Sequence, residues 1–159
     1  AMDLSFRTDC GKFNYRACAV ILRDGEILAM HDERSPYYYL PGGRVQFGET
    51  AEAAVLREVR EELRVTGRIV RPLWLNQAFF TEDVDHLPYH ELCIYFLVDV
   101  DGTGLTAQTA PFSIREGAQT LTFEWLPFAR LRDAYFYPEF LKSEIFHLPD
   151  ALTLRTETE

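Results

Sequence analysis

The sequence predicts an α+β fold in which a mixed β-sheet lies between helices, as an α/β/α sandwich. Short β-prone runs separated by turn residues recur along the chain. Two segments, at 50–63 and 138–148, place apolar residues at helical spacing between those runs. The 159 residues include 47% apolar and 26% charged residues, which is typical of a globular protein, so we expect a single domain over residues 1–159.

The first predicted strands form a hairpin. Ala17–Leu22 is a continuous β-prone run, and Asp24-Gly25 is a strong tight-turn signal that makes Ile27–Met30 the return strand. Tyr37–Leu40 is predicted as a short aromatic strand. It leads into Pro41–Gly43, a turn whose glycines allow close backbone approach and positive φ.

The clearest helix is predicted at Thr50–Leu63. Thr50 is a suitable N-cap, and Glu52 suits the positive end of the helix dipole. The helix has an apolar stripe at helical spacing, formed by Val55, Leu56, Val59 and Leu63. This stripe indicates that one face of the helix packs on the sheet.

The second half of the chain is predicted to alternate strands with loops. Further strands are expected at Val65–Leu75, His90–Val100 and Leu121–Leu126. Asp101–Gln119 is expected to be a long loop without regular structure, a feature that is often functional. Pro138–Leu148 is predicted as a second helix, with Pro138 in its first turn, and the polar tail 153–159 is expected to be frayed.

Charge and cysteine content restrict the classes of function. The formal net charge of −9 argues against nonspecific binding to DNA, RNA or an anionic membrane. The three cysteines form no CxxC pair, and no apolar run approaches the ~20 residues of a membrane span. No signal peptide is visible, and residues 1–2 are expected to be a remnant of cloning. We therefore expect a cytoplasmic protein.

The predicted helix at 50–63 carries an unusual group of carboxylates. Glu58, Glu61 and Glu62 fall within an arc of about 100° around the helix axis. One interpretation is a solvated charged face, in which Arg57 pairs with Glu61. The other is a metal site, because the i,i+4 pair of Glu58 and Glu62 is repulsive unless a divalent cation lies near it. An oxygen-rich site of this kind suits Mg²⁺ or Mn²⁺.

The spacing of these residues resembles a known signature. Gly43, Glu49 and the segment Arg57–Leu63 match the Nudix box of the Nudix hydrolase superfamily, here from Gly43 to Val65. Every fixed position matches except Arg64, where the family has glycine. A glycine there would end the helix in a left-handed conformation, whereas arginine adopts it at a cost of about 1 kcal/mol.

The resemblance implies a Nudix fold and Mg²⁺-dependent hydrolysis of a pyrophosphate bond in a nucleoside diphosphate derivative. The metal ligands that it implies are Gly42, through its carbonyl, and Glu58, Glu61 and Glu62. The catalytic residues that it implies are Arg57, which orients the glutamates, and the general-base candidates Glu61 and Glu116. Glu49 would bridge the loop to the helix. His90 and Glu91 are weaker candidates for the same region.

The substrate is less well defined. We assign Tyr39, Arg44 and Phe80 as substrate-binding candidates, although aromatic residues at alternating positions are also typical of a core. A nucleoside triphosphate pyrophosphatase that releases a nucleoside monophosphate is the default expectation, and hydrolysis of nucleotide sugars is an alternative. A non-catalytic nucleotide or sugar sensor is the alternative from another class. The expected partner is a small nucleotide, without RNA or DNA, and a homodimer is a candidate assembly.

Overall fold

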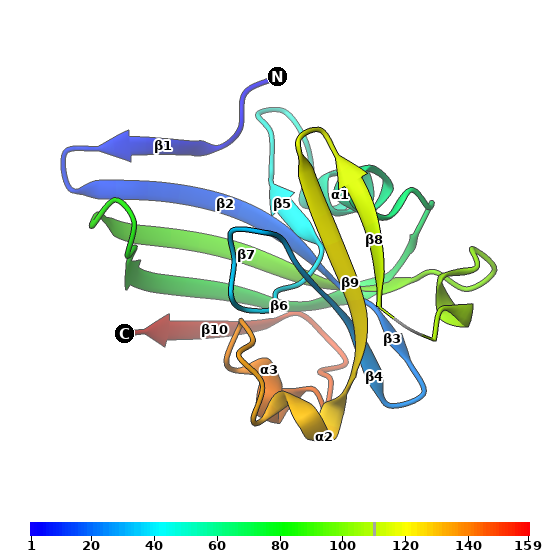
Figure 1. Cartoon of the computed structure of the whole chain (residues 1–159). Helices are drawn as coiled ribbons and strands as arrows, with labels where there is room; N and C mark the ends of the chain where they lie inside the picture. Colours follow the sequence, from blue (N-terminus) through cyan, green and yellow to red (C-terminus); the bar gives the residue numbers. More distant parts are fainter. Residues whose placement is uncertain (110) are drawn as a thin grey trace.

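The computed structural model describes residues 1–109 and 111–159, and its strands form two sheets (Figure 1). The larger sheet is mixed, because β2 runs parallel to β7 and β10 runs parallel to β6, while β6 and β7 are antiparallel. In spatial order its strands are β1 (Ser5–Thr8), β2 (Gly11–Val20), β7 (Pro88–Asp99), β6 (Arg68–Thr81) and β10 (Thr153–Thr158). β5 (Gly42–Arg44) also pairs with β2 but is not part of this strand order. The strands of the smaller sheet are, in order, β3 (Leu22–Arg23), β4 (Glu26–His31), β9 (Gln119–Pro127) and β8 (Phe112–Glu116).

Helices lie on both sides of the larger sheet. On one side α1 (Ala51–Leu63) contacts β2 and β5, and on the other α2 (Phe128–Leu131) and α3 (Leu141–Glu144) follow β9 (Figure 1). A single 3₁₀ turn, Leu105–Ala107, lies between β7 and β8 among the described residues. The predicted α+β class, a mixed sheet with helices on its two faces, is therefore confirmed.

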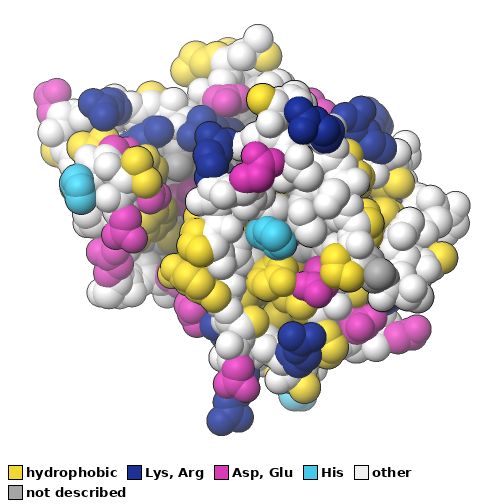
Figure 2. Space-filling model, in the orientation of Figure 1, with side chains coloured by type: hydrophobic (Ala, Val, Ile, Leu, Met, Phe, Trp, Pro, Cys, Tyr) yellow, Lys and Arg dark blue, Asp and Glu magenta, His cyan; other side chains and the backbone are white. Residues whose placement is uncertain are grey.

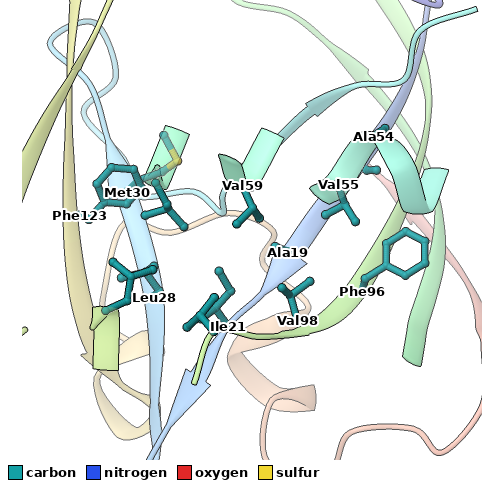
Figure 3. Packing of buried hydrophobic residues seen from close by; sticks show 14 of the residues in the cluster. Ala19, Ile21, Leu28, Met30, Ala54, Val55, Val59, Phe96, Val98 and Phe123 are labelled. Carbon is teal, nitrogen blue, oxygen red and sulfur yellow. The ribbon is translucent and has the colours of Figure 1, made fainter. Parts of the chain in front are cut away.

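Successive side chains of β2 point to opposite faces of the sheet, so this strand contributes to two hydrophobic clusters. Ala17 and Ala19 point toward the cluster that contains the buried stripe of α1, whereas Cys18 and Val20 point toward a second cluster. Figure 3 shows the first cluster, in which residues of α1 meet those of both sheets. Because both faces of β2 are buried, its sequence is a continuous apolar run at 17–21 and not an alternating one.

Helix α1 has well-defined ends. The Thr50 hydroxyl accepts a hydrogen bond from the Ala53 N–H at 3.0 Å, as expected of an N-cap. Arg64 ends the helix in the left-handed region at φ 61° and ψ 28°, although it is not glycine. Its guanidinium donates to the Arg115 carbonyl in β8 at 3.0 Å. The arginine thus keeps the left-handed exit and ties the end of the helix to the smaller sheet.

One strand prediction and one loop prediction need correction. Tyr37–Leu40 is not a strand, because it forms only isolated bridges, from Tyr39 to Met30 and from Tyr38 to Phe136. The 101–119 segment is not structureless, since it contains the 3₁₀ turn and all of β8; residue 110 lies outside the described residues. Its polar composition concealed β8, which pairs with β9 at the edge of the smaller sheet.

The C-terminal predictions also change. The regular helix within Pro138–Leu148 is only α3, because the surrounding residues form tighter i→i+3 turns, such as Leu141 N–H to the Pro138 carbonyl. The tail is not frayed. Thr153–Thr158 forms β10, and its Glu157 carboxylate accepts a hydrogen bond from the Asn76 side chain at 2.7 Å. Backbone pairing with β6 orders this polar segment, which buries too little apolar surface to be recognised from sequence.

None of the described helices combines the length and the apolar character needed to cross a membrane. On the face shown in Figure 2, basic, acidic and apolar side chains are intermingled.

Candidate active site

Two adjacent glycines in β5 place this strand against both β2 and α1. A Cβ atom on Gly42 would lie 2.4 Å from the Ala17 carbonyl oxygen and 2.7 Å from the Cys18 Cα. A Cβ atom on Gly43 would lie 2.5 Å from Oε1 of Glu58. Both positions therefore need glycine because of close approach, the first to a strand backbone and the second to a carboxylate.

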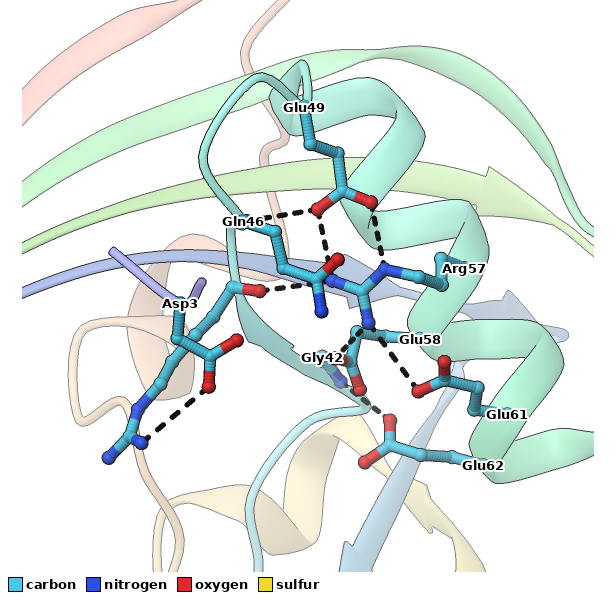
Figure 4. Close-up of polar contacts among 9 residues, drawn as sticks. Asp3, Gly42, Gln46, Glu49, Arg57, Glu58, Glu61 and Glu62 are labelled. Carbon is cyan, nitrogen blue, oxygen red and sulfur yellow. Dashed lines mark hydrogen bonds and ion pairs between the residues drawn. The ribbon is translucent and has the colours of Figure 1, made fainter. Parts of the chain in front are cut away.

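Arg57 is the centre of the polar network on α1 (Figure 4). Its Nε and Nη2 donate to the two carboxylate oxygens of Glu49 at 2.8 and 3.0 Å, a bidentate arrangement. Its Nη1 donates to Glu58 at 2.8 Å and lies 3.4 Å from Glu61. Glu49 also accepts the Gln46 N–H at 3.0 Å, so the loop is closed onto the helix. The geometry expected of Arg57 and Glu49 is present.

Glu58 and Glu62 are carboxylates removed from solvent on neighbouring turns. Glu62 is only 8% exposed and accepts the Gly42 N–H at 2.9 Å. Burial, and then the charge of Glu58, raise the pKa of Glu62 well above its ordinary value. Burial also raises the pKa of Glu58, although the adjacent Arg57 opposes this change. The half-buried Glu58 and the buried Glu62 therefore lie on neighbouring turns of α1, in surroundings that disfavour negative charge on either carboxylate.

Glu116 is the last residue of β8, and not a residue of a long loop. Burial, and then the charge of Glu61, raise its pKa. Its Oε2 is buried and has no hydrogen-bond partner among the described residues. The structure thus brings Glu116 close to the glutamates of α1, although it is distant in sequence.

A cleft of about 920 Å³ lies beside this network. Gly43 and Glu58 line it, and so do all three substrate-binding candidates, Tyr39, Arg44 and Phe80. The Tyr39 hydroxyl donates to Asp32 at 2.6 Å, Arg44 lies 3.9 Å from Asp3, and the Phe80 ring stacks on Tyr89. Glu61, Glu62 and Glu116 do not line the cleft.

Arg16 is a cleft residue that sequence reasoning missed. It lies on β2 and is half-buried, and its guanidinium forms no hydrogen bond or ion pair with the residues that the structure describes. The signal was the polar alternation of Asn14 and Arg16 in an otherwise apolar strand. Of the two weaker candidates, Glu91 lines the cleft, whereas His90, whose ring packs on Phe79, does not.

The fold and the site define an α+β protein in which a glycine-anchored loop and an acidic helix border a cleft. The NUDIX domain family model matches residues 12–143, and the chain belongs to the Nudix family.

Relatives in other organisms support this assignment. The chain is 37% identical over 91 residues to an ADP-ribose pyrophosphatase of Methanocaldococcus jannaschii, which covers 55% of the chain and 52% of the relative. It is 33% identical over 85 residues to an RNA pyrophosphohydrolase of Sphingopyxis alaskensis, covering 50% and 54% of the two chains. The chain thus spans about half the length of these curated relatives. An ADP-ribose pyrophosphatase structure from Streptococcus suis shares the fold, with a TM-score of 0.60 and 14% identity over 90% of this chain and 98% of that one.

Nudix hydrolases generally use a divalent metal ion. Among the described residues, no three His, Cys, Asp or Glu side chains converge closely enough to hold a metal ion. In this structure Arg57 donates to Glu58, and the Gly42 N–H donates to Glu62. The donor set nevertheless fits a hard cation. Glu58 and Glu62 supply carboxylate oxygens on adjacent turns, and a buried oxygen of Glu116 has no hydrogen-bond partner among the described residues.

Proposed function

We propose that the chain hydrolyses a diphosphate bond in a nucleoside diphosphate derivative, with Mg²⁺ or Mn²⁺ as cofactor. The observation that carries this proposal is the buried Glu62 beside the half-buried Glu58, which lines the cleft. The same cleft presents the guanidinium of Arg16, which has no partner among the described residues. Glu58 and Glu62 would hold the metal, with Glu61 and the Gly42 carbonyl as further ligands. The names of the two curated relatives both describe hydrolysis of a pyrophosphate bond, but they give different substrates.

The metal supplies charge neutralisation and a coordinated water of lowered pKa. In the proposed reaction, water attacks one phosphorus, the bond from that phosphorus to the bridging oxygen breaks, and the second phosphate leaves. A carboxylate accepts the proton of the water. Glu61 and Glu116 are the two candidates for this base. Arg57 holds Glu58 and Glu61 in place, and Arg16 would bind a phosphate oxygen.

Turnover of a nucleotide panel tests this function. Nucleoside triphosphates, dinucleotides and nucleoside diphosphates esterified to sugars or alcohols would be incubated with the protein and Mg²⁺, with EDTA as control. We expect metal-dependent cleavage, and product identification would show which phosphorus is attacked. Binding of a nucleotide without hydrolysis of any panel member would instead support a sensor. Glu61→Gln and Glu116→Gln, compared across pH, would then identify the base.

Gly43→Ala should reduce activity without unfolding the protein. The added methyl group would lie 2.5 Å from Oε1 of Glu58 and would displace that flexible carboxylate, not the backbone. A displacement of about 1 Å in a catalytic site can lower the rate by about a hundredfold. We expect a loss of this size in kcat, measured on the best substrate of the panel.

Gly42→Ala is the matched comparison for this variant. Its methyl group would meet the backbone of Ala17 and Cys18, which cannot move without opening the sheet. We expect a loss of about 1–3 kcal/mol in the free energy of unfolding, as for other overpacked sites. If Gly43→Ala were instead as unstable as Gly42→Ala, its activity loss would not report on Glu58.

Arg16→Leu should weaken substrate binding. A charge-assisted hydrogen bond contributes about 1.5–3 kcal/mol, so we expect kcat/KM to fall by about one to two orders of magnitude, mainly through KM. Arg130→Leu, which removes an exposed arginine of α2 outside the cleft, is the control. An unchanged KM in Arg16→Leu would remove this arginine from the binding site.

A further inference from the structure

Three tyrosine rings gather at one part of the cleft. Tyr37 follows β4, whereas Tyr135 and Tyr137 lie between α2 and α3, so these residues come from segments other than α1. The ring centroids of Tyr37 and Tyr137 are 5.1 Å apart, and those of Tyr135 and Tyr137 are 5.9 Å apart. The Tyr37 to Tyr135 distance is 5.6 Å. We call these residues the tyrosine cluster.

The tyrosine cluster presents aromatic surface to solvent. Tyr135 is 54% exposed and Tyr137 is 44% exposed, although both contact other rings. The planes of Tyr37 and Tyr137 are inclined at 82°, so their faces point in different directions. Cation–π contacts extend to about 6 Å from a ring centroid, so one cation resting on the cluster can contact more than one ring.

Carboxylates with no ion pair among the described residues surround the same cleft. They are Asp32, Glu82, Asp83, Glu91, Glu157 and Glu159. Arg44 and Glu139 also line the cleft, but Arg44 pairs with Asp3 and Glu139 pairs with Lys142. Arg16 is therefore the one lining cation without a partner among the residues described. Apart from Arg16 the cleft is negative, and an anionic group at the tyrosine cluster would be repelled.

A buried acceptor in the same cleft also lacks a partner. Asn76 lies on β6 and is 2% exposed. Its Nδ2 donates to Glu157, but its Oδ1 accepts no hydrogen bond from the described residues. Buried polar atoms normally have partners, so the cleft offers this acceptor to a water molecule or to a donor on a bound group.

We propose that the tyrosine cluster binds a cationic organic group, an alkylated ammonium or a positively charged ring, carried by the substrate beyond its diphosphate. This inference rests on the proposed function for the diphosphate itself, whereas binding of the cation does not depend on turnover. The substrate would then carry opposite charges at its two ends. The anionic diphosphate would lie near α1 and Arg16, and the cation would lie on aromatic faces among carboxylates.

Binding of a small cation tests the proposal directly. The probe is choline chloride, and the control is 3,3-dimethylbutan-1-ol, which has the same shape without the charge. Tyrosine ring resonances would be followed by NMR during titration with each compound. We expect choline to shift the resonances of the tyrosine cluster at concentrations at least tenfold lower than the neutral alcohol. Equal effects of the two compounds would overturn the proposal.

Substitutions then locate the site. Tyr137→Leu should weaken choline binding by about tenfold, which corresponds to the loss of about 1.4 kcal/mol, whereas Tyr137→Phe should retain it because the ring face remains. Phe146→Leu, which alters an exposed aromatic residue of the α3 region outside the cleft, is the control. Unchanged binding in a folded Tyr137→Leu, checked by circular dichroism, would place the cation elsewhere.

A comparison of two substrates separates this inference from the proposed function. The probes are cytidine diphosphate esters of choline and of 3,3-dimethylbutan-1-ol. We expect the choline ester to have the higher kcat/KM, by about tenfold, and Tyr137→Leu to bring the ratio close to one. Choline binding without hydrolysis of either ester would support the cation site and count against the hydrolase. Hydrolysis of both esters at equal rates would support the hydrolase and overturn the cation site.

Discussion

Glu62→Gln is expected to abolish metal-dependent turnover while making the protein more stable in EDTA. Substitution of a residue that only hydrogen-bonds a metal ligand typically lowers activity or metal affinity by about 10–100-fold. Loss of a proposed ligand itself should have a larger effect. The same change removes a carboxylate that is 8% exposed and lies beside Glu58. The amide oxygen of the introduced glutamine can still accept the Gly42 N–H, so no buried donor loses its partner.

The stability effect should depend on pH in a defined direction. The pKa of Glu62 is raised in the folded protein from its ordinary value of 4.5, so the folded state binds this proton more tightly than the unfolded state. Stability in EDTA should therefore fall as the pH rises from about 4.5 through the raised pKa, and remain lower above it. Glu62→Gln should lack this decrease and exceed the wild type at neutral pH by on the order of 1–3 kcal/mol, because it removes a charge that burial and the neighbouring Glu58 disfavour.

Thermal unfolding across pH and steady-state kinetics check the two effects together. Glu61→Gln is the control for stability, because the Glu61 side chain is 52% exposed and its charge is solvated. Normal turnover by Glu62→Gln would contradict the metal assignment. Lost turnover without any gain in stability in EDTA would instead contradict the account of its burial.

Arg57→Lys is expected to lower kcat by about a hundredfold although the positive charge is kept. The guanidinium binds Glu49 in a bidentate manner and reaches Glu58 with its other terminal nitrogen. A lysine ammonium has three donors on one nitrogen and lacks the planar fork, so it cannot bind Glu49 through two nitrogens and also hold Glu58 in its present position. The carboxylate of Glu58 would then lose its fixed position, and displacement of about 1 Å is enough for a loss of this size.

The apparent affinity for Mg²⁺, taken from the metal dependence of kcat, should fall in the same variant. Arg60→Lys provides the comparison, because Arg60 is an exposed residue of the same helix outside the network. Activity within twofold of the wild type in Arg57→Lys would show that its charge, and not its fork geometry, is what matters.

Sequence predicts the local part of this site well. The residues at Thr50–Leu63 predict a helix with Thr50 as its N-cap, and α1 is Ala51–Leu63 with that cap. Both the cap and the apolar stripe are encoded within a few residues, so neighbouring segments are not needed to recognise them. The carboxylates that Arg57 contacts also lie within a few residues of it in the sequence. The functional roles of these residues remain predictions.

The remainder depends on contacts between distant segments. β10 has a polar sequence and is ordered by pairing with β6, which no local pattern reveals. Arg16 was overlooked because a central strand is expected to be apolar on both faces, whereas part of one face of β2 lines the cleft. Glu116 was identified through resemblance, and its neighbourhood with Glu61 arises only when β8 packs near α1.

The separate origin of the two parts of the cleft has a consequence for protein engineering. The carboxylates and their arginine belong to one continuous segment, 42–63, which is fastened to β2 through Gly42. The tyrosine cluster comes from the loop after β4 and from the segment between α2 and α3. If the proposed roles hold, exchanging 135–137 between relatives should change the group accepted beyond the diphosphate while the residues of 42–63 stay the same.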